Sequence, residues 1–227
     1  MSLMQFCENI VKIMKNYWSV FLIEGVSYTI ILSIITVFFG AIFGALLALG
    51  KRSKFKPLVW LINAFVEVIR GTPILLQLYF GYFIVPMMFP FLGMSDFVSI
   101  AVALVINSAA YVSEIIRSGI QAVDRGQTEA ARSLGLNSRQ TMMKIVLPQA
   151  IKNILPALGN EFVMIIKETS LASTFFIGDL MTSYLKVKGI TFLSLECLFI
   201  VGVIYFVMTF VLSKVIGVYE RRLKNSD

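Results

Sequence analysis

Long apolar runs separated by short polar connections dominate the sequence. A helix needs about 20 apolar residues to cross roughly 30 Å of hydrocarbon. Five runs are predicted to be transmembrane helices, at residues 27–49, 58–88, 97–116, 147–166 and 190–218. We expect the second run to break or kink at Arg70-Gly71-Thr72-Pro73, because Gly and Pro interrupt helices. The pattern therefore predicts an all-α integral membrane bundle of five transmembrane helices.

The basic residues predict the orientation of this bundle. The loop at residues 51–56 carries four positive charges, and residues 117–147 and the tail at 220–224 are also basic. Cytoplasmic loops are enriched in Lys and Arg, so these segments are expected inside, which gives an N-out, C-in layout. Residues 1–25 mix apolar, aromatic and charged positions and predict an amphipathic helix at the membrane interface. We expect one membrane domain over residues 1–227.

Composition supports a membrane protein and narrows its chemistry. The chain is 58% hydrophobic and only 15% charged, whereas soluble domains have about a quarter of their residues charged. The net charge of +7 lies in short clusters between apolar runs, which favours membrane topology over nucleic-acid binding. Histidine is absent, which excludes imidazole catalysis and histidine metal sites. Cys7 and Cys197 match no metal-binding spacing, so no metal site is predicted.

Two glycines in the first span predict a close helix contact. Gly40 and Gly44 form a GxxxG pattern, which permits two helix backbones to approach each other. The nearby segment from Gly44 to Lys51 resembles a phosphate-binding loop, but it has one residue too many and lacks the following Ser or Thr. The chain therefore carries no nucleotide-binding signature. Any use of ATP must belong to another subunit.

The longest polar run, residues 129–148, predicts a short helix, a break and a second helix. Thr128 is a candidate N-cap of the first helix. Gly135 can end that helix in the left-handed conformation. Asn137 and Gln140 have the spacing of a capping box at the start of the next helix. A small capped helix outside the membrane suits a docking surface, although an ordinary polar loop is the alternative.

Polar residues recur inside the predicted spans at helical spacing. Charges at the bilayer centre cost roughly 2.5–3.5 kcal/mol each, so they usually face a cavity or a partner. The stripes are Asn63, Glu67 and Arg70 on the second span, Asn107, Tyr111 and Glu114 on the third, and Asn153, Asn160 and Lys167 on the fourth, with Glu161 beside them. Facing one another, they would line a polar pathway. Alternatively, Glu67 and Arg70 pair with each other and hold the bundle together.

The side chains of these stripes indicate the kind of molecule that could pass. A carboxylate can hold an ammonium group and a guanidinium can hold a carboxylate. The combination of Glu67, Glu114 and Glu161 with Arg70 therefore suits a zwitterion with a polar or cationic side chain, such as an amino acid. Three acids against one arginine favour a basic amino acid (arginine, lysine or histidine), with glutamine as the close rival.

The polar run also resembles a known motif. Its residues Glu129-Ala130-Ala131, Gly135, Ile145 and Leu147-Pro148 have the fixed spacing of the EAA motif of bacterial ABC-importer permeases. The runs Glu67–Pro73 and Lys167–Leu171 resemble the polar amino acid branch of the same family. The resemblance covers nearly the whole chain, from about Gly25 to the basic tail.

This resemblance implies a type I importer permease fold in the bacterial cell membrane. It implies three protein partners: a cytoplasmic ABC ATPase that binds ATP and Mg²⁺, a second permease subunit in a homodimer or heterodimer, and an external substrate-binding protein. By analogy, the ATPase would be contacted by Glu129, Ala130, Ala131, Leu134 and Gly135. The implied candidates for the substrate site are Asn63, Glu67, Arg70, Thr72, Tyr111, Glu114, Asn160 and Glu161.

Two other classes of function compete with this interpretation. An ion-coupled secondary transporter or channel would work without ATP, but such proteins often show inverted internal repeats, and none is evident here. A membrane enzyme would need a nucleophile–base pair or a metal cluster, which the sequence does not offer. The leading hypothesis is therefore the membrane subunit of an ATP-driven importer, which itself binds no cofactor and is not an enzyme.

Overall fold

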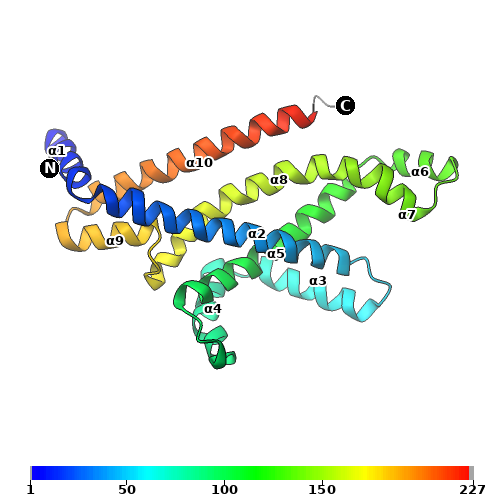
Figure 1. The fold of residues 1–227 in the computed structure, drawn as a ribbon, viewed down its shortest axis with the longest axis horizontal. Helices are drawn as coiled ribbons and strands as arrows, with labels where there is room; N and C mark the ends of the chain where they lie inside the picture. The colour runs from blue at the N-terminus through cyan, green and yellow to red at the C-terminus, as the bar shows by residue number, and fades with distance from the viewer. Residues whose placement is uncertain (1, 225–227) are drawn as a thin grey trace. The chain divides into compact units, whose positions relative to one another are not determined.

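The computed structural model describes residues 2–224, and these residues form helices without any strand. In Figure 1 the chain runs through the α-helices α1 Leu3–Ser19, α2 Val26–Gly50, α3 Lys56–Gly71, α4 Ile74–Met88, α5 Asp96–Gln121, α6 Arg125–Ser133, α7 Ser138–Thr141, α8 Leu147–Glu168, α9 Leu180–Thr191 and α10 Ser194–Lys224. Shorter π or 3-10 segments are η1 Val20–Gly25, η2 Pro90–Leu92, η3 Met142–Val146 and η4 Thr169–Phe175. The predicted all-α class is confirmed.

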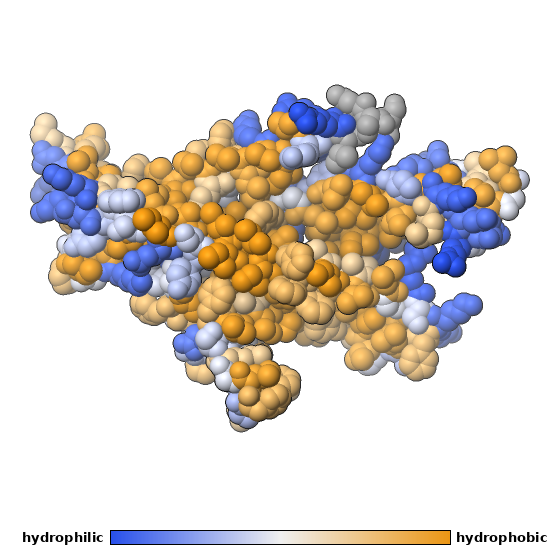
Figure 2. Space-filling model, viewed as in Figure 1, coloured by the Kyte–Doolittle hydropathy of each residue, from blue (hydrophilic) through white to orange (hydrophobic). Residues whose placement is uncertain are grey.

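Several of these helices are long and apolar enough to cross a bilayer. Within the described residues they are the continuous helical stretch Leu3–Gly50, α5, and α10 as far as Arg222. The helices α3 and α4 together form a fourth candidate, bent by 110°. This bend confirms the predicted break, because Thr72 is extended and Pro73 precedes α4. The helix α8, which covers the predicted span at residues 147–166, is not among these candidates, so the five-span count stays a prediction. Figure 2 shows apolar surface along the long helices and hydrophilic surface on α6 and α7.

The described residues group into two compact units, each assembled from separate stretches of the chain. The first unit takes the chain up to Val37 and adds Ile74–Leu104 and Phe162–Leu212. One of its apolar clusters joins α1 and η1 to α9 and α10 through buried Ile13, Phe21, Leu180, Tyr184, Val187, Cys197, Ile200 and Val201. A second cluster joins α2, α4, α5 and η4.

The helix α9 lies mostly between the predicted spans at residues 147–166 and 190–218, where the sequence pattern predicted no helix. It begins after Asp179, which is fully buried and caps the helix by accepting hydrogen bonds from the Met181 amide and the Thr182 hydroxyl. The Thr29 hydroxyl accepts from the Leu180 amide at 3.0 Å. Asp179 stands between η4 and α9, outside the membrane-spanning helices, and its burial raises the pKa of its carboxyl to about 6.

The second unit contains Phe38–Pro73, Val105–Glu161 and the chain from Ser213 onward. Here the predicted glycine contact is confirmed. A Cβ on Gly40 would lie 2.5 Å from the Ser108 Oγ, and a Cβ on Gly44 would lie 2.6 Å from the Val112 Cβ. These positions hold the end of α2 directly against α5. The buried residues Ile62, Val66 and Ala110 then join α3 to α5.

Candidate functional site

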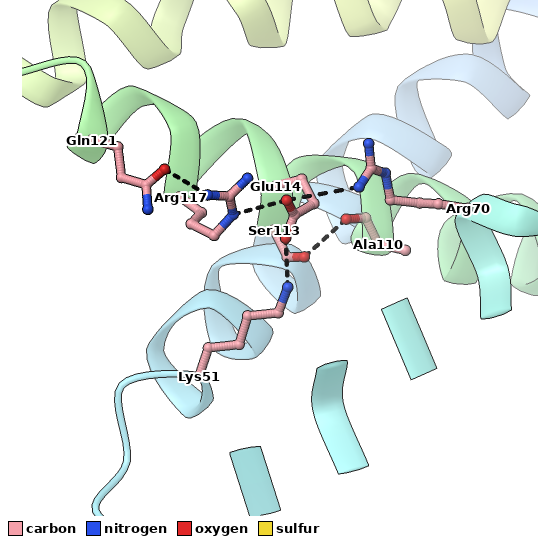
Figure 3. Close-up of polar contacts among 7 residues, drawn as sticks. All are labelled: Lys51, Arg70, Ala110, Ser113, Glu114, Arg117 and Gln121. Atoms are coloured by element: carbon pink, nitrogen blue, oxygen red, sulfur yellow. Dashed lines mark hydrogen bonds and ion pairs between the residues drawn. The ribbon is translucent and has the colours of Figure 1, made fainter. Parts of the chain in front are cut away.

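The carboxylate of Glu114 lies at the centre of a charged cluster in the second unit (Figure 3). The Lys51 Nζ lies 2.6 Å from its Oε1, and the Arg117 Nε lies 2.8 Å from its Oε2. The Arg70 Nη1 is 3.7 Å from the same Oε2. The Lys51 and Glu114 side chains are only 12% and 15% exposed. The negative charge of Glu114 is therefore largely removed from solvent, and its stability depends on the positive partners around it.

Each member of the cluster is positioned by a different part of the second unit. Lys51 follows the last residue of α2, and Arg70 stands near the end of α3. Glu114 and Arg117 are one turn apart on α5, where the Arg117 Nη1 also donates to Gln121 Oε1 at 2.5 Å. Three positive side chains meet one carboxylate, so the cluster carries a net charge of +2. Such a cluster attracts anions.

A cavity of about 380 Å³ opens beside this cluster. Its wall is built from Arg70 of α3, Tyr111, Glu114, Ile115, Ser118, Gly119 and Ala122 of α5 and its end, and Asn153 and Ala157 of α8. The Arg70 guanidinium lies over the Tyr111 ring, 5.5 Å from its centroid, which is a cation–π distance. The volume lies within the range of about 300–1,000 Å³ that is usual for small-molecule pockets.

The structure brings together some of the predicted substrate-site residues and leaves others apart. Arg70, Tyr111 and Glu114 share the cavity wall. The remaining predicted residues are not on that wall: Asn63 and Glu67 are exposed on α3, Thr72 donates its hydroxyl to the Val68 carbonyl at 2.9 Å, Asn160 is exposed on α8, and Glu161 accepts a hydrogen bond from the Ser108 hydroxyl at 3.4 Å. The substrate role of all these residues stays a prediction.

Two residues of the site were not predicted from the sequence. By sequence, Lys51 belongs to the basic loop at residues 51–56, and Arg117 begins the basic segment at residues 117–147. The sequence did hold one signal, since Arg117 follows Glu114 at i+3, a spacing at which oppositely charged helical residues meet. Nothing local indicates Lys51, which reaches Glu114 across 63 positions of sequence.

The polar run at residues 129–148 folds into a helical hairpin, with α6 and α7 side by side (Figure 1). Gly135 has φ +86° and ends α6 in the left-handed region, as predicted. The predicted capping box is confirmed, because Asn137 Oδ1 accepts from the Gln140 amide and Gln140 Oε1 accepts from the Asn137 amide. The N-cap prediction was wrong. Asp124 caps α6 through the Gly126 amide, and Thr128 lies inside the helix.

The residues predicted to meet an ATPase differ in their exposure on this hairpin. Glu129, Ala130 and Gly135 are exposed, and Leu134 is 84% exposed. Ala131 is only 4% exposed, so its side chain is not accessible to a partner. Leu134 is therefore an accessible apolar side chain within an otherwise polar segment.

The fold and the apolar helices define an α-helical integral membrane protein. The chain belongs to the family of binding-protein-dependent transport system inner membrane components, whose model matches residues 40–225. It is accordingly a permease subunit and not an enzyme. No group of three or more potential metal ligands lies among the residues that the structure describes.

Curated relatives match along most of the chain. The arginine transport system permease protein ArtQ of Bacillus subtilis (strain 168) is 41% identical, over 91% of this chain and 94% of the relative. The L-cystine transport system permease protein TcyB of the same organism is 36% identical, over 93% and 89%. The glutamine transport system permease protein GlnP of Escherichia coli (strain K12) is 35% identical, over 89% and 93%.

Solved structures confirm the permease fold. A crystal structure of an amino acid ABC transporter with histidines has a chain that is 42% identical to this one, with a TM-score of 0.85. The match covers 92% of this chain and 96% of that one. An inward-facing structure of the MetNI methionine ABC transporter is 18% identical with a TM-score of 0.74, and it covers 89% and 96%. This second likeness concerns the fold alone.

Proposed function

We propose that this chain is the permease subunit of an ATP-driven importer for polar amino acids in the bacterial cell membrane. The family and the amino acid permeases among its relatives support this proposal. The observation that carries it is the hairpin of α6 and α7, which displays Leu134 and Gly135 at its tip. An ATPase that holds this tip can move the spans between outward and inward openings.

The proposal assigns the hairpin as the contact with the ATPase. Glu129, Ala130, Leu134 and Gly135 are accessible to a partner, whereas buried Ala131 would act by keeping the hairpin in shape. ATP and Mg²⁺ bind to the ATPase, and this chain binds no cofactor. A second permease subunit, identical or different, completes the pathway, and an external binding protein delivers the amino acid. In this assembly five spans cross the lipid bilayer with the N-terminus outside.

The polar residues of the second unit support an amino acid as the cargo. Glu161 and Arg70 offer opposite charges, which suits the ammonium and carboxylate groups of a zwitterion. The basic amino acids and glutamine remain the preferred cargo. The preference for a basic side chain now depends mainly on Glu161, because Glu114 is already paired with Lys51 and Arg117. The relatives of this chain include permeases of arginine and of glutamine transport systems, which is consistent with either kind of cargo.

A matched pair of glycine variants tests the coupling role. Gly135 and Gly93 both have positive φ, of +86° and +53°, and neither has a neighbour that would meet an added Cβ. Both Gly135→Asp and Gly93→Asp therefore place a side chain at positive φ without a steric clash, but only Gly135 lies in the hairpin. Each variant is reconstituted with its ATPase and binding protein, and ATP hydrolysis is measured together with uptake of labelled arginine and glutamine.

We expect Gly135→Asp to lose at least about nine-tenths of uptake per ATP hydrolysed, while the protein still inserts into the membrane. Gly93→Asp should transport nearly as well as the unaltered chain. Equal uptake by the two variants would refute the coupling role of the hairpin. Absence of ATP-dependent uptake by the unaltered complex would refute the proposed function itself.

A further inference from the structure

We propose that the cavity lined by α3, α5 and α8 in the second unit is a subsite for the carboxylate of the carried amino acid. In this subsite Arg70 is the ligand, while Lys51 and Arg117 act as positioning residues that occupy Glu114. The inference rests on the proposed function, since it names the part of the substrate that this cavity receives.

Glu114 is the first reason to assign an anion, and not a cation, to the cavity. Its two carboxylate oxygens already face Lys51 at 2.6 Å and Arg117 at 2.8 Å. A substrate ammonium would have to displace one of these cations from a pair that is largely shielded from water. Glu114 is therefore better placed to organise the surrounding positive charges than to bind a cationic substrate.

The geometry of Arg70 is the second reason. Its nearest nitrogen is 3.7 Å from Glu114, which is longer than a hydrogen bond. Its side chain is 43% exposed and lines the cavity. The contact with the Tyr111 ring, at 5.5 Å from Cζ to centroid, helps to hold the guanidinium at the cavity wall. A guanidinium binds a carboxylate in its own plane through two parallel hydrogen bonds.

The remaining groups of the wall fit an anionic ligand as well. Ser118 and Asn153 add a hydroxyl and an amide to the wall, and both groups can donate hydrogen bonds. The Asn153 amide nitrogen already donates to the Gly119 carbonyl at 3.5 Å, which leaves its second hydrogen for a ligand. With a net charge of +2 in the cluster, a carboxylate entering the cavity reduces the repulsion among the three cations.

The two ends of a zwitterion are thus assigned to different residues. The carboxylate goes to Arg70, and the ammonium or a basic side chain is left to Glu161, which is not on this wall. Glu114 then changes from a predicted substrate ligand into the counter-ion that arranges the site. Neutralising Arg70 should therefore weaken binding of the carboxylate, whereas neutralising Glu114 should not.

The test compares amino acids with their carboxamides, which lack the carboxylate. The purified complex of the permease with its ATPase, without the binding protein, is equilibrated with labelled L-arginine or L-glutamine. L-argininamide and L-glutaminamide are the competitors. We expect the unaltered complex to prefer the acid over the amide by about tenfold or more, and Arg70→Gln to abolish this preference. Arg70→Lys, which keeps the charge without the planar fork, should retain an intermediate preference.

Two further variants supply a control and test the role of Glu114 as the counter-ion. Arg52→Gln removes an exposed arginine next to Lys51 and should leave the preference unchanged. Glu114→Gln should leave carboxylate binding intact or strengthen it, because a competing acceptor is removed from Arg70. The inference is overturned if Arg70→Gln keeps the preference, if Glu114→Gln weakens arginine and argininamide binding alike, or if the unaltered complex binds no amino acid. ATP-dependent uptake measured in parallel separates these outcomes from failure of the proposed function.

Discussion

Replacing Lys51 by Met removes the shortest ion pair of the Glu114 cluster and keeps a side chain of similar length. At 2.6 Å, two unit charges in an effective dielectric constant of about 20 attract each other by about 6 kcal/mol. The cost of removing both charges from water offsets most of this attraction. Arg117, at 2.8 Å, continues to compensate Glu114. We therefore expect a net loss of about 2 kcal/mol in the free energy of unfolding, below the 3–5 kcal/mol typical of a fully orphaned buried charge.

Thermal unfolding in detergent measures this loss. A domain of 150–250 residues loses roughly 2–4 °C in Tm for each kcal/mol, so Lys51→Met should lower Tm by about 4–8 °C. Lys54→Met, which removes an exposed lysine of the same loop, should change Tm by less than about 1 °C.

A double-mutant cycle isolates the pair itself. In a Glu114→Gln background the change at Lys51 should cost much less, because the lysine no longer has its carboxylate. The reasoning is refuted if Lys51→Met lowers Tm equally in both backgrounds, or no more than Lys54→Met does.

Two further predictions concern burial and helix packing. Burial raises the pKa of Asp179 to about 6, above its unfolded value of about 3.9, so the folded state binds this proton more tightly and its contribution to stability is lost as pH rises through 6. Asp179→Asn keeps the helix cap without the charge, and above pH 7 it should stabilise the protein by up to about 3 kcal/mol. If the Tm of this variant fell between pH 4 and 7 as steeply as that of the unaltered chain, the prediction would be contradicted. A leucine at Gly44 would collide with Val112 and the Ala109 carbonyl, so Gly44→Leu should sharply reduce the yield of folded protein in size-exclusion chromatography. Gly202→Leu, at a position with open space around it, should not, and equal yields would argue against the close contact.

Features set by the local chain could be predicted from the sequence. The break between α3 and α4 follows from Gly71 and Pro73, whose effects on the backbone act within one turn. The same holds for the left-handed end of α6 at Gly135 and for the capping box of Asn137 and Gln140. The close contact at Gly44 could also be anticipated, since only a missing side chain permits it.

Features that depend on tertiary contacts could not be predicted in the same way. Periodicity placed Glu114 on a polar stripe. It could not show that Lys51, which follows the end of α2, forms an ion pair with this carboxylate. The helix α9 could not be predicted because it is held by contacts with η1, which is distant in sequence, and with η4, which is an irregular 3-10 segment. Asp124 and Thr128 are both acceptable caps by residue type, and the choice between them is made by the fold.

The most direct test of the central claim is uptake into proteoliposomes by the purified chain, with and without its ATPase. We predict that labelled arginine or glutamine enters only when the ATPase, ATP and the binding protein are present. Gly135→Asp should abolish that uptake while the altered chain remains in the membrane. Uptake by the chain alone, driven by an ion gradient without ATP, would contradict the account.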